Sequence, residues 1–294
     1  MKDFPNLSDE EATYFLQPAF SLSSEGYEAF IHTILAFYEE YGRQFVWRET
    51  TDPYRILLSE VMLQQTQTSR VIPKYELFLS FWPTLKDLAE VPLDQLLYHW
   101  KGLGYNRRAL NLRKSAIMSE QWGWNLPQKQ EQLLTLPGVG KATAAAIGAF
   151  SFQERTIYLE TNIRRVLLSC FFPDEEQVKD KDLEAVLAHL VEMVDDPKHW
   201  YYALMDFGVL LKNLIHNANV RSAHYTKQQK FENSNRQIRG QLIHLLSDTG
   251  AKDEDHLLAI LSHFEKERVL YCLGQLEQEG FVEESHGTYR IAKT

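Results

Sequence analysis

Residues 131–150 read EQLLTLPGVGKATAAAIGAF, a stretch that predicts two helices joined by a tight turn. Gly138 and Gly140 flank the apolar Val139, and glycine lets the backbone turn so sharply that several N–H groups face outward. The second helix is expected to begin at Lys141, and the partial positive charge of its N-terminus favours an anion beside the turn. The turn can therefore bind a phosphate group without a charged side chain. For G-V-G taken alone, a plain connection between helices is the alternative.

The sequence on both sides of this turn is also helical. Apolar residues recur at helical spacing from Tyr27 to the break at Gly42, and again over 54–82, 87–100 and 110–122. Strand patterns are scarce before about residue 280, and no internal repeat of about 20–50 residues occurs. The body of the chain is therefore predicted to be all-α.

The last part of the chain has a different pattern. A polar, basic stretch over 217–240 is typical of a linker. The periodicity after it predicts three helices, near 237–247, 255–264 and 266–279. The alternation around His286 and Gly287 predicts a short hairpin, and three helices with a small β-wing resemble a winged-helix domain.

Composition limits the class of protein. The 294 residues carry a net charge of −9, which argues mildly against a nucleic-acid binder unless basic side chains are gathered locally. No apolar run approaches the ~20 residues of a membrane span, and the acidic N-terminus is unlike a signal peptide. We therefore expect no membrane partner and a cytoplasmic protein, associated with the bacterial nucleoid in use. With only two cysteines, Cys170 and Cys272, one chain cannot supply a four-thiolate zinc or iron–sulfur site.

An ordered series of further motifs carries a resemblance to a known family. The motifs are Trp47-Arg48, Asp52-Pro53-Tyr54, SEVMLQQTQ at 59–67, GLGY at 102–105 and NIRRVL at 162–167. Together with the turn at 136–141 they resemble the A/G-specific adenine DNA glycosylases of the helix-hairpin-helix (HhH-GPD) superfamily, over about 27–211. The resemblance implies a two-lobed all-α glycosylase fold, followed here by the winged-helix-like domain.

The resemblance also implies a domain organisation and an activity. We expect an N-terminal arm over 1–26, a glycosylase core over 27–230 and the winged-helix-like domain over 236–294. In the core, a six-helix lobe would span about 55–155, and a second lobe would combine 27–54 with 156–230. The implied protein is a monomer that binds double-stranded DNA, flips out adenine mispaired with 8-oxoguanine or guanine, and hydrolyses its N-glycosidic bond.

Two carboxylates match the catalytic positions of the family. Glu60 corresponds to the acid that protonates adenine at N7, and a carboxyl group in an apolar pocket, here beside Val61 and Met62, keeps its proton more readily. Glu160 stands where the family has an aspartate, at a point where positive charge develops on the sugar. The extra methylene of glutamate shifts the carboxylate by ~1 Å, a displacement that can cost about a hundredfold in rate.

The remaining site residues also follow from the resemblance. Gln65 is expected to wedge into the base stack and Tyr105 to intercalate beside the lesion. The DNA-binding residues implied are Gln64, Gln65, Thr66, Tyr105, Gly138, Val139, Gly140 and Lys141. Those implied for the base pocket are Trp47, Arg48 and Tyr202.

Several positions depart from the family. Ala142 replaces the lysine nucleophile of bifunctional relatives, so water is the expected nucleophile. The four cysteines that hold an iron–sulfur cluster in most relatives are absent after Gly208, so no such cofactor is expected. Binding of a monovalent or divalent cation at the hairpin remains an alternative. The basic residues that follow form either a phosphate-binding strip or a solvated linker: Arg221, His224, Lys227, Lys230, Arg236 and Arg239. Residues 236–294 carry a net charge of −3, which favours a protein partner or a structural brace for this domain.

Tyr202 and Asn106 also differ from the family's usual residues and leave the excised base open. Thymine, uracil, 5-hydroxymethyluracil and hypoxanthine are alternatives to adenine. A non-catalytic DNA-damage binder is the third hypothesis, since Glu160 and the acidic C-terminal domain both depart from an active enzyme of this family.

Overall fold

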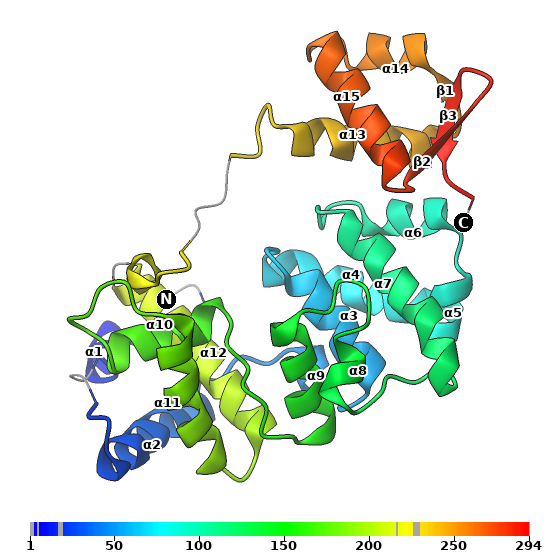
Figure 1. Ribbon diagram of the computed structural model, residues 1–294. Coiled ribbons are helices and arrows are strands. Elements are labelled where there is room, and N and C mark those ends of the chain that lie inside the picture. Colours follow the sequence, from blue (N-terminus) through cyan, green and yellow to red (C-terminus); the bar gives the residue numbers. More distant parts are fainter. Residues whose placement is uncertain (1–2, 5, 17–19, 216, 226–229, 294) are drawn as a thin grey trace. The chain divides into compact units, whose positions relative to one another are not determined.

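The computed structural model describes all residues except 1–2, 5, 17–19, 216, 226–229 and 294. Within this part of the chain the structure is mostly helical, with one small antiparallel sheet near the C-terminus (Figure 1). The predicted helical body with a small C-terminal α+β part is thus confirmed. Among the described residues, no helix combines the length and the apolar character needed to cross a membrane.

The chain divides into two compact units. The first contains Met1–Ile56, Gln128–Leu134 and Val139–Lys227, and the second contains Leu57–Pro127, Thr135–Gly138 and Gln228–Thr294. Helix α3 (Pro53–Leu63) starts in the first unit and ends in the second. The domain boundaries expected from the sequence remain predictions.

The first unit is built around α2 (Ser24–Tyr41) and α12 (Pro197–Leu214), whose aromatic rings meet edge to face. The ring centroids of Phe30 and Trp200 are 5.9 Å apart, and those of Phe37 and Phe207 are 5.4 Å apart. Each such pair adds about 0.5–1.5 kcal/mol to the stabilisation from buried area. The other elements of this unit are α1 (Asp9–Tyr14), η1 (Val46–Arg48), α8 (Gln130–Leu133), α9 (Lys141–Phe152), α10 (Thr161–Cys170), α11 (Asp180–Glu192) and η3 (Ala218–Arg221).

The second unit begins with helices that pack around buried aromatic rings. Phe78 contacts Trp82 at 4.9 Å and Trp100 at 5.7 Å between ring centroids. The helices are α4 (Thr68–Phe81), α5 (Leu85–Glu90), α6 (Leu93–Trp100), α7 (Arg107–Met118) and the 3₁₀ turn η2 (Ser119–Trp122).

Two of the helical runs that the sequence predicts as continuous are each divided into two helices. The run over 54–82 is broken between α3 and α4, where Gln65 adopts a left-handed φ of 55°. The run over 87–100 is broken at Pro92, because proline has no N–H to donate and restricts the residue before it. In both places apolar periodicity continues past a backbone break that it does not detect.

The C-terminal module, residues 235–291, has the order expected of a winged helix. It contains α13 (Asn235–Thr249), β1 (Lys252–Asp253), α14 (Glu254–Ile260), α15 (Lys266–Gln278), β2 (Val282–Ser285) and β3 (Thr288–Ile291). The antiparallel sheet has the strand order β1-β3-β2, with Val282 opposite Ile291. The predicted hairpin turns at His286 and Gly287, both at positive φ, which matches the twist of the strands. Strand β1 was not predicted, since two residues carry no periodicity.

The basic stretch before this module begins with residues that are bonded within the first unit, and its interpretation as a linker stays a prediction. Arg221 at the end of η3 donates to the carbonyl of Leu168 at 3.0 Å and also to those of Phe172 and Pro173. The Arg221 guanidinium is therefore hydrogen-bonded to backbone carbonyls of the first unit. Lys227 lies outside the described residues, and Arg236 and Arg239 belong to α13.

Candidate functional site

The turn between α8 and α9 has the backbone geometry that the G-V-G sequence predicts. Gly138 adopts a φ of 78°, and a Cβ there would lie 2.9 Å from Cβ of Asn111, so this position requires glycine. The Pro137 carbonyl accepts a hydrogen bond from Ser115 Oγ at 2.9 Å, which anchors the turn on α7.

Beyond the turn, the start of α9 is suited to an anion. Val139 is buried, while Gly140 and Lys141 are exposed. Gly140 is the N-cap of α9 and has no side chain with which to cap it. The first N–H groups of the helix can therefore be satisfied by an external acceptor such as a phosphate. A cation at this turn stays a prediction.

A second feature is the Gln65 turn, residues 64–67, which follows α3 directly. Gln65 is exposed and held in the left-handed region, a conformation that costs a non-glycine residue free energy. Thr66 Oγ1 is 3.2 Å from the Leu103 carbonyl oxygen, so the turn is tied to the GLGY segment.

Arg108 holds these two segments together and was not predicted as a site residue. Its guanidinium donates at 2.7–3.1 Å to four backbone carbonyls and one hydroxyl, those of Val61, Met62, Leu103, Gly104 and Thr66. Burial lowers the pKa of Arg108 to about 10, which leaves it protonated at neutral pH. The sequence offered only its position three residues after the GLGY motif as a signal.

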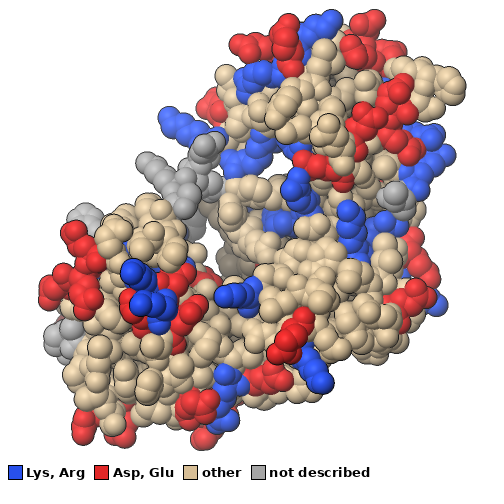
Figure 2. Space-filling model, in the orientation of Figure 1, with Lys and Arg blue, Asp and Glu red and all other residues tan. Residues whose placement is uncertain are grey.

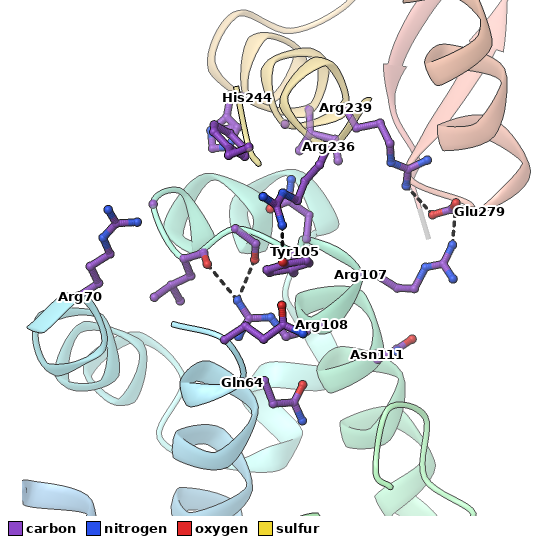
Figure 3. A pocket seen from close by; sticks show the side chains of 18 of the residues that line it. Gln64, Arg70, Tyr105, Arg107, Arg108, Asn111, Arg236, Arg239, His244 and Glu279 are labelled. Atoms are coloured by element: carbon purple, nitrogen blue, oxygen red, sulfur yellow. Dashed lines mark hydrogen bonds and ion pairs between the residues drawn. The ribbon is translucent and has the colours of Figure 1, made fainter. Parts of the chain in front are cut away.

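Tyr105 is presented by the segment that Arg108 supports. Its φ is 48°, and the Trp100 indole N–H donates to the preceding Gly104 carbonyl at 3.0 Å. Arg236 of α13 donates a hydrogen bond to the Tyr105 hydroxyl, and its Cζ lies 4.9 Å from the ring centroid (Figure 3). The predicted intercalating ring is therefore contacted by a residue of the C-terminal module.

A pocket of about 1010 Å³ opens around Tyr105, within the second unit. It brings together the predicted residues Gln64, Gln65 and Tyr105. It also contains residues that the sequence did not assign to it, among them Arg70, Arg107, Arg239, Phe231 and Glu279 (Figure 3).

Glu60 lies on α3, one turn before the Gln65 turn. The residue is half-buried, between the buried Ser59 and Val61, and Met62 after it is fully buried. The apolar pocket expected around the Glu60 carboxyl stays a prediction. The role of Glu60 as an acid also stays a prediction.

Two of the three predicted base-pocket residues are in contact in the first unit. The Arg48 guanidinium lies 4.6 Å from the centroid of the buried Tyr202 ring. Trp47 is also buried, and its ring stacks on Phe45 at 4.8 Å.

Asp206, which the sequence analysis missed, explains the position of Arg48. Arg48 donates to its two carboxylate oxygens at 2.8 and 2.9 Å, and Arg43 donates to them at 2.6–2.9 Å. Burial alone would raise the pKa of Asp206, but the hydrogen bonds and charges of both arginines outweigh it and hold that pKa below its usual value. A lone aspartate in the apolar stretch WYYALMDFGVLL was the available signal.

Glu160 is the N-cap of α10. Its Oε1 accepts hydrogen bonds from the N–H groups of Asn162 at 2.7 Å and Ile163 at 3.0 Å. Burial raises the pKa of Glu160, and these two hydrogen bonds oppose the rise. One oxygen is thus used by the helix, and the side-chain amide of Asn162 lies 3.4 Å from the other.

The chain does not provide the ligands of an iron–sulfur cluster. Cys170 and Cys272 are both buried and unpaired, and burial raises the pKa of Cys170 to about 12, which keeps it a neutral thiol. Among the described residues, no group of three or more His, Cys, Asp or Glu side chains is placed to hold a metal ion. No step of the proposed chemistry is assigned to a metal.

The fold and the hairpin define a helix-hairpin-helix repair protein, and comparison with known proteins agrees. Residues 58–193 match the HhH-GPD superfamily of base excision DNA repair proteins, and the chain belongs to this superfamily. Its curated relatives include the adenine DNA glycosylase of Mycolicibacterium smegmatis, 30% identical over 234 residues that cover 74% of this chain and 80% of the relative. That of Buchnera aphidicola subsp. Baizongia pistaciae is 36% identical over 187 residues, 62% of this chain and 52% of the relative.

The chain spans about half the length of the first relatives it matches. Among solved structures, a thermostable thymine-DNA glycosylase is 28% identical with a TM-score of 0.54, covering 62% of this chain and 85% of that one. An endonuclease III trapped on DNA, 20% identical with a TM-score of 0.52 over 63% of this chain and 86% of that one, shares the fold.

Proposed function

We propose that this chain is a monofunctional DNA glycosylase that flips adenine out of double-stranded DNA, opposite 8-oxoguanine or guanine, and hydrolyses its N-glycosidic bond as a monomer. The observation that carries the proposal is the position of Glu60, half-buried on α3 one turn before the exposed Gln65. A proton donor and a residue suited to fill the vacated stack then lie on consecutive segments. The similarity to adenine DNA glycosylases supports adenine as the base.

The chemistry needs the leaving base to be neutralised. Adenine departs poorly as an anion, and protonation at N7 by Glu60 lets it leave as a neutral molecule. General acid catalysis of this kind contributes about 10²–10⁴ in rate. As the bond breaks, positive charge develops on the sugar, and a carboxylate there stabilises it.

We assign the second role to Glu160. Its Oε1 is held by two N–H groups of α10, so the carboxylate is oriented before the reaction and need not reorganise. Water completes the reaction. Ala142 on the exposed first turn of α9 has no amine to attack the sugar, so no Schiff base forms there.

The proposal is tested by base release from duplexes that pair adenine with 8-oxoguanine or guanine, followed by heating in alkali to cleave abasic sites. Glu60→Gln is expected to reduce the rate at least about a hundredfold. Glu76→Gln, at an exposed position of α4, is the matched control and is expected to retain the wild-type rate. Borohydride should trap no covalent enzyme–DNA adduct. Wild-type protein that releases no base from any duplex would refute the proposal.

A second candidate is excision of another base, and the resemblance to a thymine-DNA glycosylase favours it. Duplexes that carry thymine, uracil, 5-hydroxymethyluracil or hypoxanthine opposite guanine separate the two candidates. Release of one of these bases and not of adenine would retain the glycosylase class and replace the substrate.

A further inference from the structure

The charge of the C-terminal module is unevenly distributed. Although the module is acidic overall, α13 directs Arg236 and Arg239 into the pocket around Tyr105. In Figure 2 acidic and basic side chains are both present on the outer face of the module, and further basic ones lie where it meets α6 and α7. The lining of the pocket includes five arginines, Arg70, Arg107, Arg108, Arg236 and Arg239, and a single carboxylate, Glu279.

We propose that this pocket extends the DNA-binding surface beyond Gln64, Gln65 and Tyr105, with Arg70, Arg236 and Arg239 holding backbone phosphates of one DNA strand. The site would make the C-terminal module part of the DNA-binding surface. It goes beyond the proposed function, because it does not depend on which base is excised or whether one is released.

The composition of the lining supports DNA as the ligand. Guanidinium groups present paired donors that match a phosphate. The exposed Phe231, the Tyr105 ring and the amides of Gln64 and Gln275 are suited to stacking and to polar contacts with nucleotides. A protein partner would instead favour an apolar centre with few charges.

The pocket also includes the residue that packs against Gly138. Asn111, which lines the pocket, is the residue that lies against Gly138 at the start of the G-V-G turn. The pocket therefore borders the first glycine of the turn, within the second unit.

Glu279 marks the position of an anion within the pocket. Its carboxylate lies 2.6 Å from Nη2 of Arg107 and 2.6 Å from Nη2 of Arg239 (Figure 3). Burial would raise the pKa of Glu279, but its bonds to the two arginines outweigh this and lower it, so the group is charged at neutral pH. A phosphate entering here competes with this carboxylate for the same donors.

Because of this competition, Glu279→Gln is expected to bind DNA more tightly. Freeing two guanidinium groups should lower Kd by about three- to tenfold and steepen the dependence of log K on log salt by about one. If Glu279 served only to brace α13, the same substitution would leave binding unchanged or weaken it.

The matched control is Asp248→Asn. Asp248 pairs with Lys101 at 2.5 Å, which joins α13 to the end of α6 outside the pocket. The change in net charge is the same as in Glu279→Gln. We expect Kd to stay within about twofold of wild type, since counterion release depends on where the charge lies.

Loss of the arginines should have the opposite effect. The double variant Arg236→Gln/Arg239→Gln is expected to weaken binding at least about tenfold and to reduce the salt slope by about two. Because Arg239 also pairs with Glu279, Arg70→Gln serves as an independent variant. Arg70 is exposed on α4, outside the module, and its loss should weaken binding severalfold without unfolding α13.

The experiment uses the full chain and measures fluorescence anisotropy of a labelled duplex across a salt series, in the Glu60→Gln background so that base release is slow during the measurement. Thermal melts confirm that each variant folds. Phosphate contacts carry no base information, so each change should be equal opposite guanine and opposite 8-oxoguanine.

Unchanged affinity in both the Arg70 and the double variant would overturn the proposal, as would an effect confined to one opposite base. Failure of the proposed function would appear differently, as absence of base release from wild type.

Discussion

Replacement of Asp206 by asparagine tests the buried ion-pair network of the first unit. The side chain is fully buried, and its two oxygens accept five hydrogen bonds from Arg43 and Arg48. Asparagine keeps one oxygen and places an NH₂ group where the other accepted two N–H donors, from the Arg43 backbone and Arg48 Nη1. Each lost bond to a charged group costs about 1.5–3 kcal/mol, and removing one partner of a buried pair costs about 3–5 kcal/mol. We therefore expect Asp206→Asn to lower the free energy of unfolding by about 3–5 kcal/mol.

The assay is urea denaturation followed by circular dichroism, supported by a thermal melt in which Tm should fall by about 6–20 °C. The control is Asp180→Asn, in the same unit. Asp180 pairs with Arg164 at 2.8 Å, but the two side chains are 29% and 19% exposed, so the expected loss is at most about 1 kcal/mol. Equal losses from the two substitutions would show that burial does not set the strength of the Asp206 network.

Three further predictions follow from single contacts. Because the folded-state pKa of Asp206 is lowered, the stability that its ionised form contributes is present above pH ~4 and is lost as pH falls toward the folded pKa. As pH is lowered from 6 to 3, the urea midpoint should therefore fall less steeply in Asp206→Asn than in the wild type. Gly138→Ala should lower the free energy of unfolding, measured by thermal melts, by about 1–3 kcal/mol, because φ is 78° and Asn111 fills the Cβ position. Gly140→Ala is the control and should lower it by less than about 1 kcal/mol, because no atom lies within 4 Å of a Cβ there. Equal losses at the two glycines would contradict this reasoning. Arg108→Gln should lower the free energy of unfolding by about 2–4 kcal/mol, because four carbonyls lose a charged donor, and should also weaken binding to a mismatched duplex. Weakened binding at unchanged stability would instead assign Arg108 to a direct DNA contact.

The local parts of the fold could be predicted from the sequence. The G-V-G turn, helix α2 ending at Gly42 and the hairpin at His286 and Gly287 were all indicated by residues within a few positions of one another. The reason is that helical periodicity and positive-φ turns depend on neighbours along the chain. Where apolar spacing continued through a break, as at Gln65, the same method failed.

Net charge and motif matching did not reveal which charged side chains of the site are in contact with one another. Arg48 was assigned to the base pocket by resemblance alone, and the structure places its guanidinium on Asp206, 158 positions away. Residues 236–294 were judged by their net charge of −3, which hides the arginines that α13 directs toward one pocket.

The sequence by itself therefore determined most of the helices, the turn at Gly138 and the order of the motifs, because each depends on residues adjacent in the chain. Only the tertiary structure decided which charges meet. Arg236 reaches Tyr105 across 131 positions, and Arg107 and Arg239 share Glu279. These pairings depend on how α13 packs against α6 and α15. The free energy of that packing comes from contacts between segments far apart in the chain, so it cannot be read from any single stretch of sequence.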